Sequence, residues 1–253
     1  AGKDVLLTGD RIVEAPVSWD EAAVTRNITV INNLASNTGR ELNLMIVPSA
    51  GWAMGLAEYQ DAAIIDHIYT SATVRTVDVR PVFEGMPSLY FRTDHHWTAL
   101  GAYYAYEQFA QTKGVKPVPL SKYQTRTFDG FLGTFYSGSG QTAKLAETPD
   151  KVVAYLPFNK TTCHIVEGNG NAFDWDVIKD VTDYDPGMKY ITFIGGDNAI
   201  TTITNLDNPN GETCIVIKES FGNAFVPFLI PHYSTIYVID PRHYDGTLSE
   251  FTS

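Results

Sequence analysis

Residues 42–48, Leu-Asn-Leu-Met-Ile-Val-Pro, decide the fold class that this sequence predicts. They form an apolar run of strand length, which is typical of strands buried on both faces of a parallel sheet. Residues 62–71 follow with helical periodicity, and residues 74–82 alternate and are β-branched, which indicates a second strand. The order strand, helix, strand predicts an α/β fold, with a mostly parallel sheet between two layers of helices.

The same criteria predict further elements on both sides of this unit. They are two short strands within residues 4–17 that turn at Gly9-Asp10, a helix from a Ser18 capping box to about Ser36 that Gly39 ends, a helix over 100–113, a strand over 213–218, a short helix over 224–232 and a strand over 235–240. We therefore expect both halves of the chain to supply strands to one sheet.

Residues 125–206 differ in composition, being rich in Gly, Thr, Asp and Asn with short β-like runs. We expect them to form a β-rich insertion within a single domain of residues 1–253, because this length suits one α/β domain. The aspartates of residues 174–185 lack the EF-hand pattern and indicate a solvated loop face.

Charge and hydropathy exclude several classes of function. The net charge of -11 argues against a nucleic-acid partner, which would require a basic surface. No run of 18 apolar residues is present, so we expect no membrane span. The N-terminal residues are not a signal peptide, and we expect that an export signal or anchor has been removed upstream of them.

The two cysteines, Cys163 and Cys214, leave two alternatives open. They are either free or buried thiols, or one disulfide worth ~3–4 kcal/mol in the chain-entropy model. They lack the spacing of metal ligands, and we predict neither a metal nor another cofactor.

Ser220 lies where a predicted buried strand ends and a helix begins. There its hydroxyl projects beyond the carboxyl edge of the sheet, where ligands bind in open α/β sheets. The amide of Phe221 is the first candidate to bind an oxyanion, and the side chains of Asn223 and Asn198 are further candidates. From position alone, a plain helix N-cap is the favoured alternative for Ser220.

A second group of candidates precedes the helix over 100–113. If residues 93–97 are extended, Asp94 and His96 project to one side and His95 to the other. A carboxylate beside an imidazole is what a serine nucleophile requires. A metal site that includes His95, or helix capping by Asp94 or Thr98, remains an alternative.

Several segments together resemble a known family. The string TDHHWTALGAYYAYE at 93–107 resembles the signature of the DHHW family of bacterial envelope proteins, and the resemblance extends to residues 2–14, 43–50, 218–229 and 239–244. That family is similar to the SGNH-hydrolase-like O-acetyltransferases of polysaccharides, of the AlgX and AlgJ type.

The resemblance implies an SGNH-like fold, Ser220 as the nucleophile and the pair Asp94 and His96 as its acid–base partner. Serine comes last here, whereas it comes first in ordinary SGNH hydrolases, which indicates a circular rearrangement of one site. The chain departs from the pattern at Glu219, where relatives usually carry Asp.

We therefore expect serine-dependent transfer of an acyl group, or ester hydrolysis, on a cell-envelope polysaccharide by a monomeric extracytoplasmic protein. A membrane partner that supplies the acyl donor is implied by analogy. Tyr90, Arg92 and His95 are further candidates for contact with the substrate. The alternative is a catalytically silent carbohydrate-binding or scaffold protein, with sugar rings stacked on tyrosines (Tyr90, Tyr103, Tyr104 and Tyr136).

Overall fold

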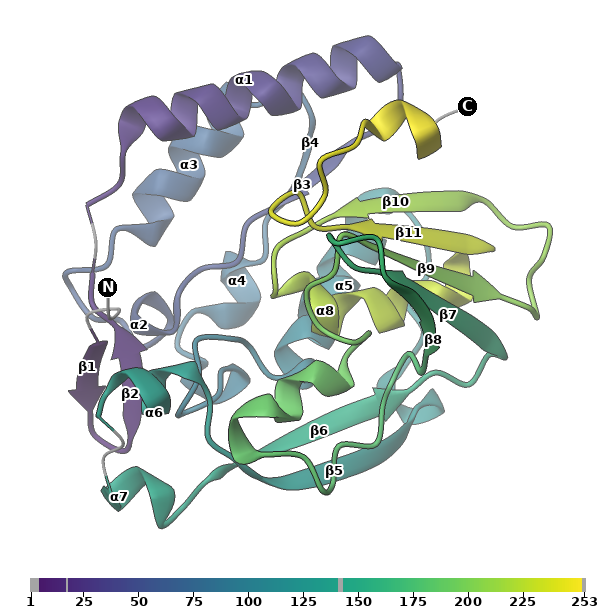
Figure 1. Ribbon diagram of the computed structural model, residues 1–253. Coiled ribbons are helices and arrows are strands. Elements are labelled where there is room, and N and C mark those ends of the chain that lie inside the picture. Colours follow the sequence, from purple (N-terminus) through teal and green to yellow (C-terminus); the bar gives the residue numbers. More distant parts are fainter. Residues whose placement is uncertain (1–4, 17, 141–142, 252–253) are drawn as a thin grey trace.

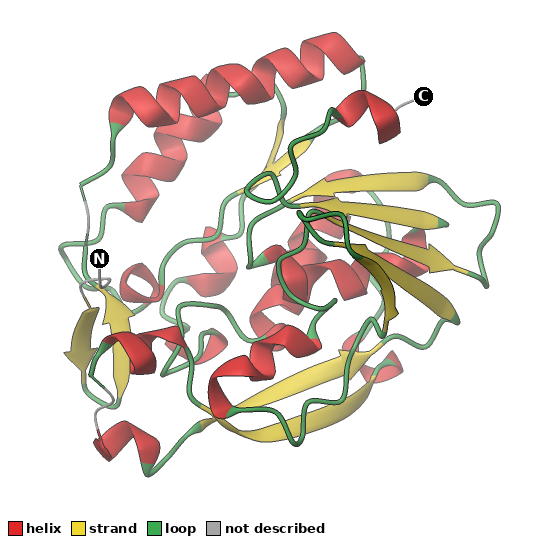
Figure 2. Cartoon of the chain, viewed as in Figure 1, coloured by secondary structure: helices red, strands yellow, loops and turns green. Residues whose placement is uncertain are grey.

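The computed structural model describes residues 5–16, 18–140 and 143–251 (Figures 1 and 2). Its largest sheet has five strands. Its strand order is β10-β11-β9-β7-β8. The bounds are β7 Thr161–Val166, β8 Ala172–Trp175, β9 Ile200–Asn205, β10 Thr213–Ile217 and β11 Thr235–Ile239. Only β10 and β11 pair in parallel; the other pairs in this sheet are antiparallel.

The expectation of one mostly parallel sheet shared by both halves of the chain is not met. Among the described residues, β3 (Asn43–Met45) and β4 (Arg75–Val77) form a separate parallel pair of three residues each. The pair is short because side chains take over the backbone groups beyond it. The amide of Ile46 donates to Tyr69 Oη at 3.0 Å.

The second expected strand also ends early, at Val77. Asp78 accepts hydrogen bonds from both the amide and the guanidinium of Arg80, and Pro81 has no amide proton for a ladder. A short helix, α4 (Arg80–Phe83), replaces the end of the strand. Local side-chain bonds thus outweigh the strand propensity of residues 78–82.

Residues 125–206 are rich in strands, as expected, but they are not peripheral to the sheet. Strands β7, β8 and β9 from this range supply three of its members. Strands β5 (Gln124–Phe131) and β6 (Asp150–Leu156) form a separate antiparallel pair. β9 has every second residue buried, which fits a strand that packs one face on the core.

The two longest helices begin and end at capping residues. Helix α1 (Glu21–Thr38) begins at Asp20, which accepts from the amide of Ala23, so the predicted Ser18 cap is wrong by two residues. Gly39 ends α1 in the left-handed conformation, with φ of 60°. Helix α5 (Ala99–Lys113) begins at Thr98 and ends at Gly114.

Figure 1 shows α1 beside α3 (Asp61–Ser71), and α5 packed within the body of the molecule. The remaining elements are the hairpin β1 (Val5–Thr8) and β2 (Arg11–Glu14) and the short helices α2 (Ala50–Ala53), α6 (Thr134–Gly138) and α7 (Ala143–Ala146). The hairpin confirms the predicted turn at Gly9-Asp10; Asp4 and Val17, the ends of that predicted segment, lie outside the described residues. In the described ranges, no helix is long and apolar enough to cross a membrane.

The helix expected over 224–232 is divided in two. α8 (Gly222–Phe225) is a single α-helical turn, and a 3-10 helix, η4 (Val226–His232), continues it. Pro227 and Pro231 lack the amide protons that an α-helix requires. The other 3-10 helices are η1 (Pro87–Leu89), η2 (Leu120–Lys122), η3 (Pro186–Thr192) and η5 (Leu248–Phe251).

Cys163 and Cys214 are free thiols in this structure. Burial raises the pKa of Cys163 to about 12 and that of Cys214 to about 11. Both side chains are therefore neutral at physiological pH.

Gly101 in α5 generates a stability prediction. A Cβ atom at this position would lie 2.7 Å from the carbonyl oxygen of Leu89. We expect Gly101→Ala to lower the free energy of unfolding by about 1–3 kcal/mol, as overpacking does. At Gly138, which ends α6, an added Cβ meets no atom within 4 Å. Gly138→Ala is therefore the control, and thermal unfolding of both variants gives the comparison. Equal melting temperatures would contradict the prediction.

Candidate active site

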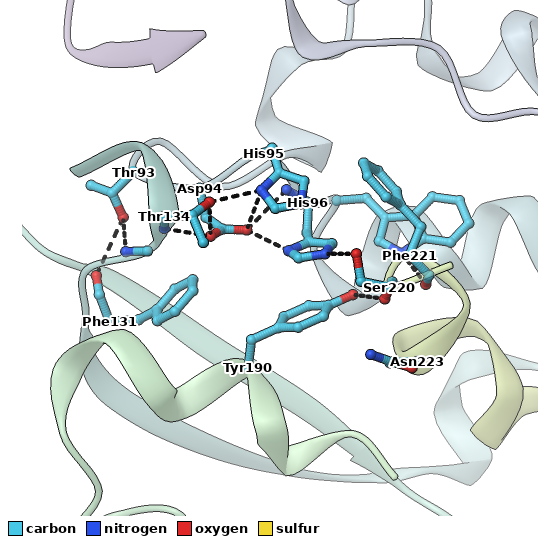
Figure 3. Close-up of polar contacts among 12 residues, drawn as sticks. Thr93, Asp94, His95, His96, Phe131, Thr134, Tyr190, Ser220, Phe221 and Asn223 are labelled. Atoms are coloured by element: carbon cyan, nitrogen blue, oxygen red, sulfur yellow. Dashed lines mark hydrogen bonds and ion pairs between the residues drawn. The ribbon is translucent and has the colours of Figure 1, made fainter. Parts of the chain in front are cut away.

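Asp94, His96 and Ser220 lie in one hydrogen-bonded row (Figure 3). His96 Nδ1 lies 2.5 Å from Asp94 Oδ1, and His96 Nε2 lies 2.7 Å from Ser220 Oγ. Ser220 follows strand β10, and the other two residues precede helix α5. The structure thus brings together three side chains that sequence reasoning took from two segments.

Asp94 and His96 meet for a different reason from the one expected. Residues 92–96 form bends rather than an extended strand. They lie between Tyr90 and Trp97, which pair in an isolated β-bridge. The amide of His96 donates to Asp94 Oδ1 at 3.0 Å, which closes a local turn around the carboxylate. This turn holds the two side chains together.

The carboxylate of Asp94 is buried and fully engaged. Its Oδ2 accepts from the amide of Thr134 at 2.7 Å and from Thr134 Oγ1 at 3.0 Å. Burial raises the pKa of Asp94, but the hydrogen bond and charge of His96 outweigh burial and hold that pKa well below its ordinary value. The ionised carboxylate accepts the Nδ1 proton, so Nε2 is free to accept the serine proton.

Helix capping and metal binding are the alternative roles for these residues. Phe221, not Ser220, is at the N-cap position of α8, and it makes no side-chain cap. Thr98 caps α5 by accepting from the amide of Gly101. His95, Asp94 and His96 are close enough to share an ion, but hydrogen bonds already join both nitrogens of His96 to Asp94 and Ser220.

His95 contacts the residues that surround the carboxylate of Asp94 and the ring of His96. Its Nδ1 lies 2.7 Å from Thr134 Oγ1 and 3.8 Å from Asp94 Oδ1. The centroids of the His95 and His96 rings lie 3.8 Å apart, so His95 packs against the histidine that lies between Asp94 and Ser220.

Sequence reasoning missed the groups that hold the Asp94 turn. Asp150, the first residue of β6, accepts through Oδ2 from the amides of Arg92 and Thr93 and from Thr93 Oγ1. Gly133 leaves the space that Asp94 fills, since a Cβ there would lie 2.2 Å from Asp94 Cβ. Neither residue lies in a motif, and neither carries a signal in the sequence.

Tyr190 is a further residue that the sequence did not indicate. Its ring stacks on His96 with centroids 4.0 Å apart and 11° between the planes. Its hydroxyl donates to the carbonyl oxygen of Ser220 at 3.3 Å. Burial raises the pKa of Tyr190 well above its ordinary value, so it remains a neutral phenol whose face can stabilise an imidazolium.

Three other candidate residues make hydrogen bonds to parts of the chain other than the serine turn. Tyr90 is buried, and its hydroxyl donates to the carbonyl of Pro48 at 2.6 Å. Arg92 Nε binds Asp10 at 2.9 Å, and Asn198 Nδ2 donates to the carbonyl of Gly195 at 3.1 Å. These contacts stabilise the fold.

Phe221 follows Ser220 directly and Asn223 lies three residues after it, and the two residues differ in their contacts. Asn223 Nδ2 donates to Asp197 Oδ1 at 2.9 Å, so this amide faces the charged groups next to the turn. The amide of Phe221 does face the site, where it donates to Glu219 Oε2 at 3.2 Å.

A charge network lies next to the turn that carries Ser220, with Lys218 and Asp240 buried and Asp197 and Arg242 partly exposed. Lys218 Nζ lies 2.8 Å from Asp197 and 3.2 Å from Asp240, which is fully buried. Arg242 binds both carboxylates, at 2.8 and 2.6 Å. The two negative and two positive charges cancel within the network, which anchors the ends of β10 and β11.

The fold and the site together define an α/β protein with a serine, a histidine and an aspartate aligned beyond the end of a strand. The model of the DHHW protein family matches residues 59–239, so the chain belongs to the DHHW family. No curated protein matches this sequence closely.

Three solved structures show the same fold. A DHHW family protein from Eubacterium siraeum is 29% identical, with a TM-score of 0.83 over 98% of this chain and 88% of that one. PatB1 of Bacillus cereus, solved with a sulfonyl adduct, is 19% identical, with a TM-score of 0.81 over 98% and 90%. The O-acetyltransferase domain of Pseudomonas putida AlgJ is 12% identical, with a TM-score of 0.53 over 93% and 78%.

The charge network predicts a large and pH-dependent cost for Asp240→Asn. The variant leaves the buried Lys218 ammonium short of one partner, so we expect a loss of about 3 kcal/mol of unfolding free energy at pH 7. The matched control is Asp129→Asn, which removes an exposed aspartate 2.9 Å from Lys151 and should cost about 0–1 kcal/mol.

The pH dependence follows from the carboxyl group of Asp240. Burial raises its pKa, but the hydrogen bonds of Arg242 and the charge of Lys218 outweigh burial and lower that pKa to about 2, below the value of ~3.9 in unfolded chains. Its contribution is complete above the unfolded pKa and is lost as pH falls from about 4 toward 2. In urea titrations the difference in unfolding free energy between wild type and Asp240→Asn should become smaller as pH falls over that range. A difference that stays constant with pH would contradict the prediction.

Proposed function

We propose that this protein transfers an acyl group, in the first place acetyl, to or from a cell-envelope polysaccharide through an acyl-serine at Ser220. The observation that carries the proposal is the hydrogen-bonded row from Asp94 through His96 to Ser220. The likeness to a structure that bears a sulfonyl adduct and to an O-acetyltransferase domain supports it at the level of the fold.

The proposed reaction follows from the proton positions in this row. Ser220 Oγ attacks the acyl carbonyl while its proton moves to His96 Nε2, and Asp94 stabilises the imidazolium. The tetrahedral intermediate expels the alcohol of the donor, which takes the proton from His96. The acyl group now forms an ester with Ser220.

The second half of the reaction uses the same groups in reverse. A water molecule or a sugar hydroxyl gives its proton to His96 and attacks the acyl-serine. Collapse of the intermediate returns the proton to Ser220 and releases either the free acid or the acylated sugar. Esterase and transferase share the first step and differ only in the acceptor.

We infer the biological setting from the resemblance seen in the sequence. The protein acts outside the cytoplasmic membrane, as a monomer, on a polysaccharide, and a membrane partner supplies the acyl donor. We further infer an SGNH-hydrolase-like three-layer arrangement in which the nucleophile segment follows the acid–base segment in the chain.

A silent binding role has less support. It would be favoured by a serine far from its histidine, whereas Ser220 and His96 lie within hydrogen-bond distance. Tyr90 and Tyr103, two of the four tyrosines considered for sugar stacking, are buried.

Ser220→Ala tests the nucleophile directly. Hydrolysis of p-nitrophenyl acetate, an activated acetyl ester, should lose at least about 10³-fold in kcat/KM, because no acyl-enzyme can form. Ser71→Ala, at the end of α3, controls for the loss of a hydroxyl elsewhere and should match wild type. Equal rates for Ser220→Ala and wild type would refute the proposal.

Asp94→Asn tests the tautomer of His96. Each oxygen of Asp94 accepts two hydrogen bonds, so an asparagine must place its NH2 group against the donors of either Thr134 or His96. With the NH2 group toward His96, Nδ1 must accept and Nε2 carries the proton; in either orientation the negative charge that stabilises the imidazolium is lost. We expect a fall of about 10³–10⁴-fold in kcat on p-nitrophenyl acetate.

The chain offers a matched control for that variant. His164 Nδ1 lies 2.9 Å from Asp174 Oδ1 in an exposed pair on β7 and β8. Asp174→Asn makes the same chemical change beside another histidine and should leave kcat unchanged. A comparable loss in both variants would show that the Asp94 effect is not specific to the site.

A further inference from the structure

Glu219 places a carboxylate oxygen beside the nucleophile. Its Oε2 lies 3.2 Å from Ser220 Oγ and 3.2 Å from the amide nitrogen of Phe221. A reacting carbonyl oxygen needs a position about 3 Å from both the nucleophile and an oxyanion donor. Glu219 Oε2 therefore lies where the oxygen of an acyl donor would bind.

The two amides that follow that of Phe221 in the turn are already used within it. The amide of Gly222 donates to the carbonyl of Glu219 at 3.0 Å, and the amide of Asn223 donates to the carbonyl of Ser220 at 3.2 Å. The side-chain amides of Asn198 and Asn223 bind Gly195 and Asp197. Of the amides of Phe221, Gly222 and Asn223, that of Phe221 is thus the one directed at the nucleophile, and Glu219 occupies it.

Glu219 also competes for the serine proton. A hydroxyl has one proton to donate, and both His96 Nε2 at 2.7 Å and Glu219 Oε2 at 3.2 Å are within reach of Ser220 Oγ. Nucleophilic attack requires that this proton go to His96. The carboxylate would also repel the negative charge that develops on the carbonyl oxygen.

We propose that the Glu219 carboxylate is an internal competitor of the acyl donor: it occupies the oxyanion position in the free protein and leaves when the donor binds. The inference rests on the proposed function of Ser220. Glu219 is exposed, and among the described residues no lysine or arginine forms an ion pair with it. Two long hydrogen bonds hold the Glu219 carboxylate, so its displacement costs little free energy.

The competition has a kinetic signature. When only a fraction of molecules is open to the donor, the apparent affinity falls by that fraction, whereas the rate in the bound complex is unaffected. Removal of the carboxylate should therefore lower KM and leave kcat nearly unchanged. A residue that merely supports the turn would lower kcat or stability when removed.

The experiment compares wild type, Glu219→Ala, Glu219→Gln and the distant control Glu21→Ala. The probes are p-nitrophenyl acetate, for kcat and KM, and phenylmethanesulfonyl fluoride, for the rate of inactivation. In the inactivation the Ser220 Oγ–S bond forms, the S–F bond breaks, the proton passes to His96 and fluoride leaves. Thermal unfolding of each variant reports whether it is folded.

We expect Glu219→Ala to raise kcat/KM and the inactivation rate by at least about threefold through a lower KM. Glu219→Gln should lie between Ala and wild type, since its amide oxygen still accepts a hydrogen bond but carries no charge. Glu21→Ala loses the same charge in α1 and should match wild type. If the Ala variant is unfolded at the assay temperature, the Gln variant decides by the same criterion.

Two results would overturn the proposal in different ways. Folded Glu219 variants with unchanged or lower kcat/KM would show that the carboxylate does not compete with the donor, while the role of Ser220 would stand. Reaction of Ser220→Ala at the wild-type rate with both probes would remove the nucleophile itself, and with it both proposals.

Discussion

The buried negative charge of Asp94 is the constraint on which the arrangement of the site depends. Asp94 is only 2% exposed, and a buried ionised carboxylate is tolerated only when its oxygens are saturated with donors. Two donors come from His96 and two from Thr134, so the charge ties the loop before α5 to the start of α6. One of these four bonds, from His96 Nδ1 to Asp94 Oδ1, also selects the His96 tautomer. Stability and the geometry for proton transfer therefore have one cause at this position.

A second carboxylate, that of Asp150, stabilises the loop around Asp94. Asp150 receives three hydrogen bonds from Arg92 and Thr93, and Thr93 Oγ1 in turn accepts from the amide of Gly133. Because Asp150 begins β6, the antiparallel pair of β5 and β6 fixes the position of the loop even though it lies outside the five-stranded sheet. Residues 125–206 were expected as an insertion that could lend Asn198 to the site, but they contribute in two other ways. They supply Asp150, which supports the Asp94 loop, and the ring of Tyr190, which stacks on His96.

The sequence alone predicted the three side chains in the row but not what surrounds them. Asp94 and His96 stand two residues apart and Ser220 follows a clear apolar strand, but position alone favoured a helix N-cap for Ser220 and left the pair open. The resemblance to the DHHW family selected the three together. Asp150, Gly133 and Tyr190 act through contacts between residues 30 to 94 positions apart in the chain, and no local pattern reports such contacts. The sheet was mispredicted for a different reason. Asp78 and Tyr69 bind backbone groups beyond β3 and β4, and these side-chain bonds end strands whose composition favours continuation.

The nucleophile and its base come from segments 124 residues apart, so the fold must fix their separation to a few tenths of an ångström. A direct tie exists beside the reacting atoms: Trp97 Nε1 donates to the carbonyl oxygen of Phe221 at 3.0 Å. Trp97 follows His96 and Phe221 follows Ser220, so this bond joins the residue after the base to the residue after the nucleophile. Trp97 is buried, which protects the bond from water, and its ring packs on that of Phe221. Together with the Tyr190 hydroxyl on the Ser220 carbonyl, this bond holds the backbone of the serine turn from two sides and leaves the Phe221 amide directed at the site. With the backbone of the turn held in this way, the competition that we propose depends on the exposed Glu219 side chain, whose position decides whether that amide is open.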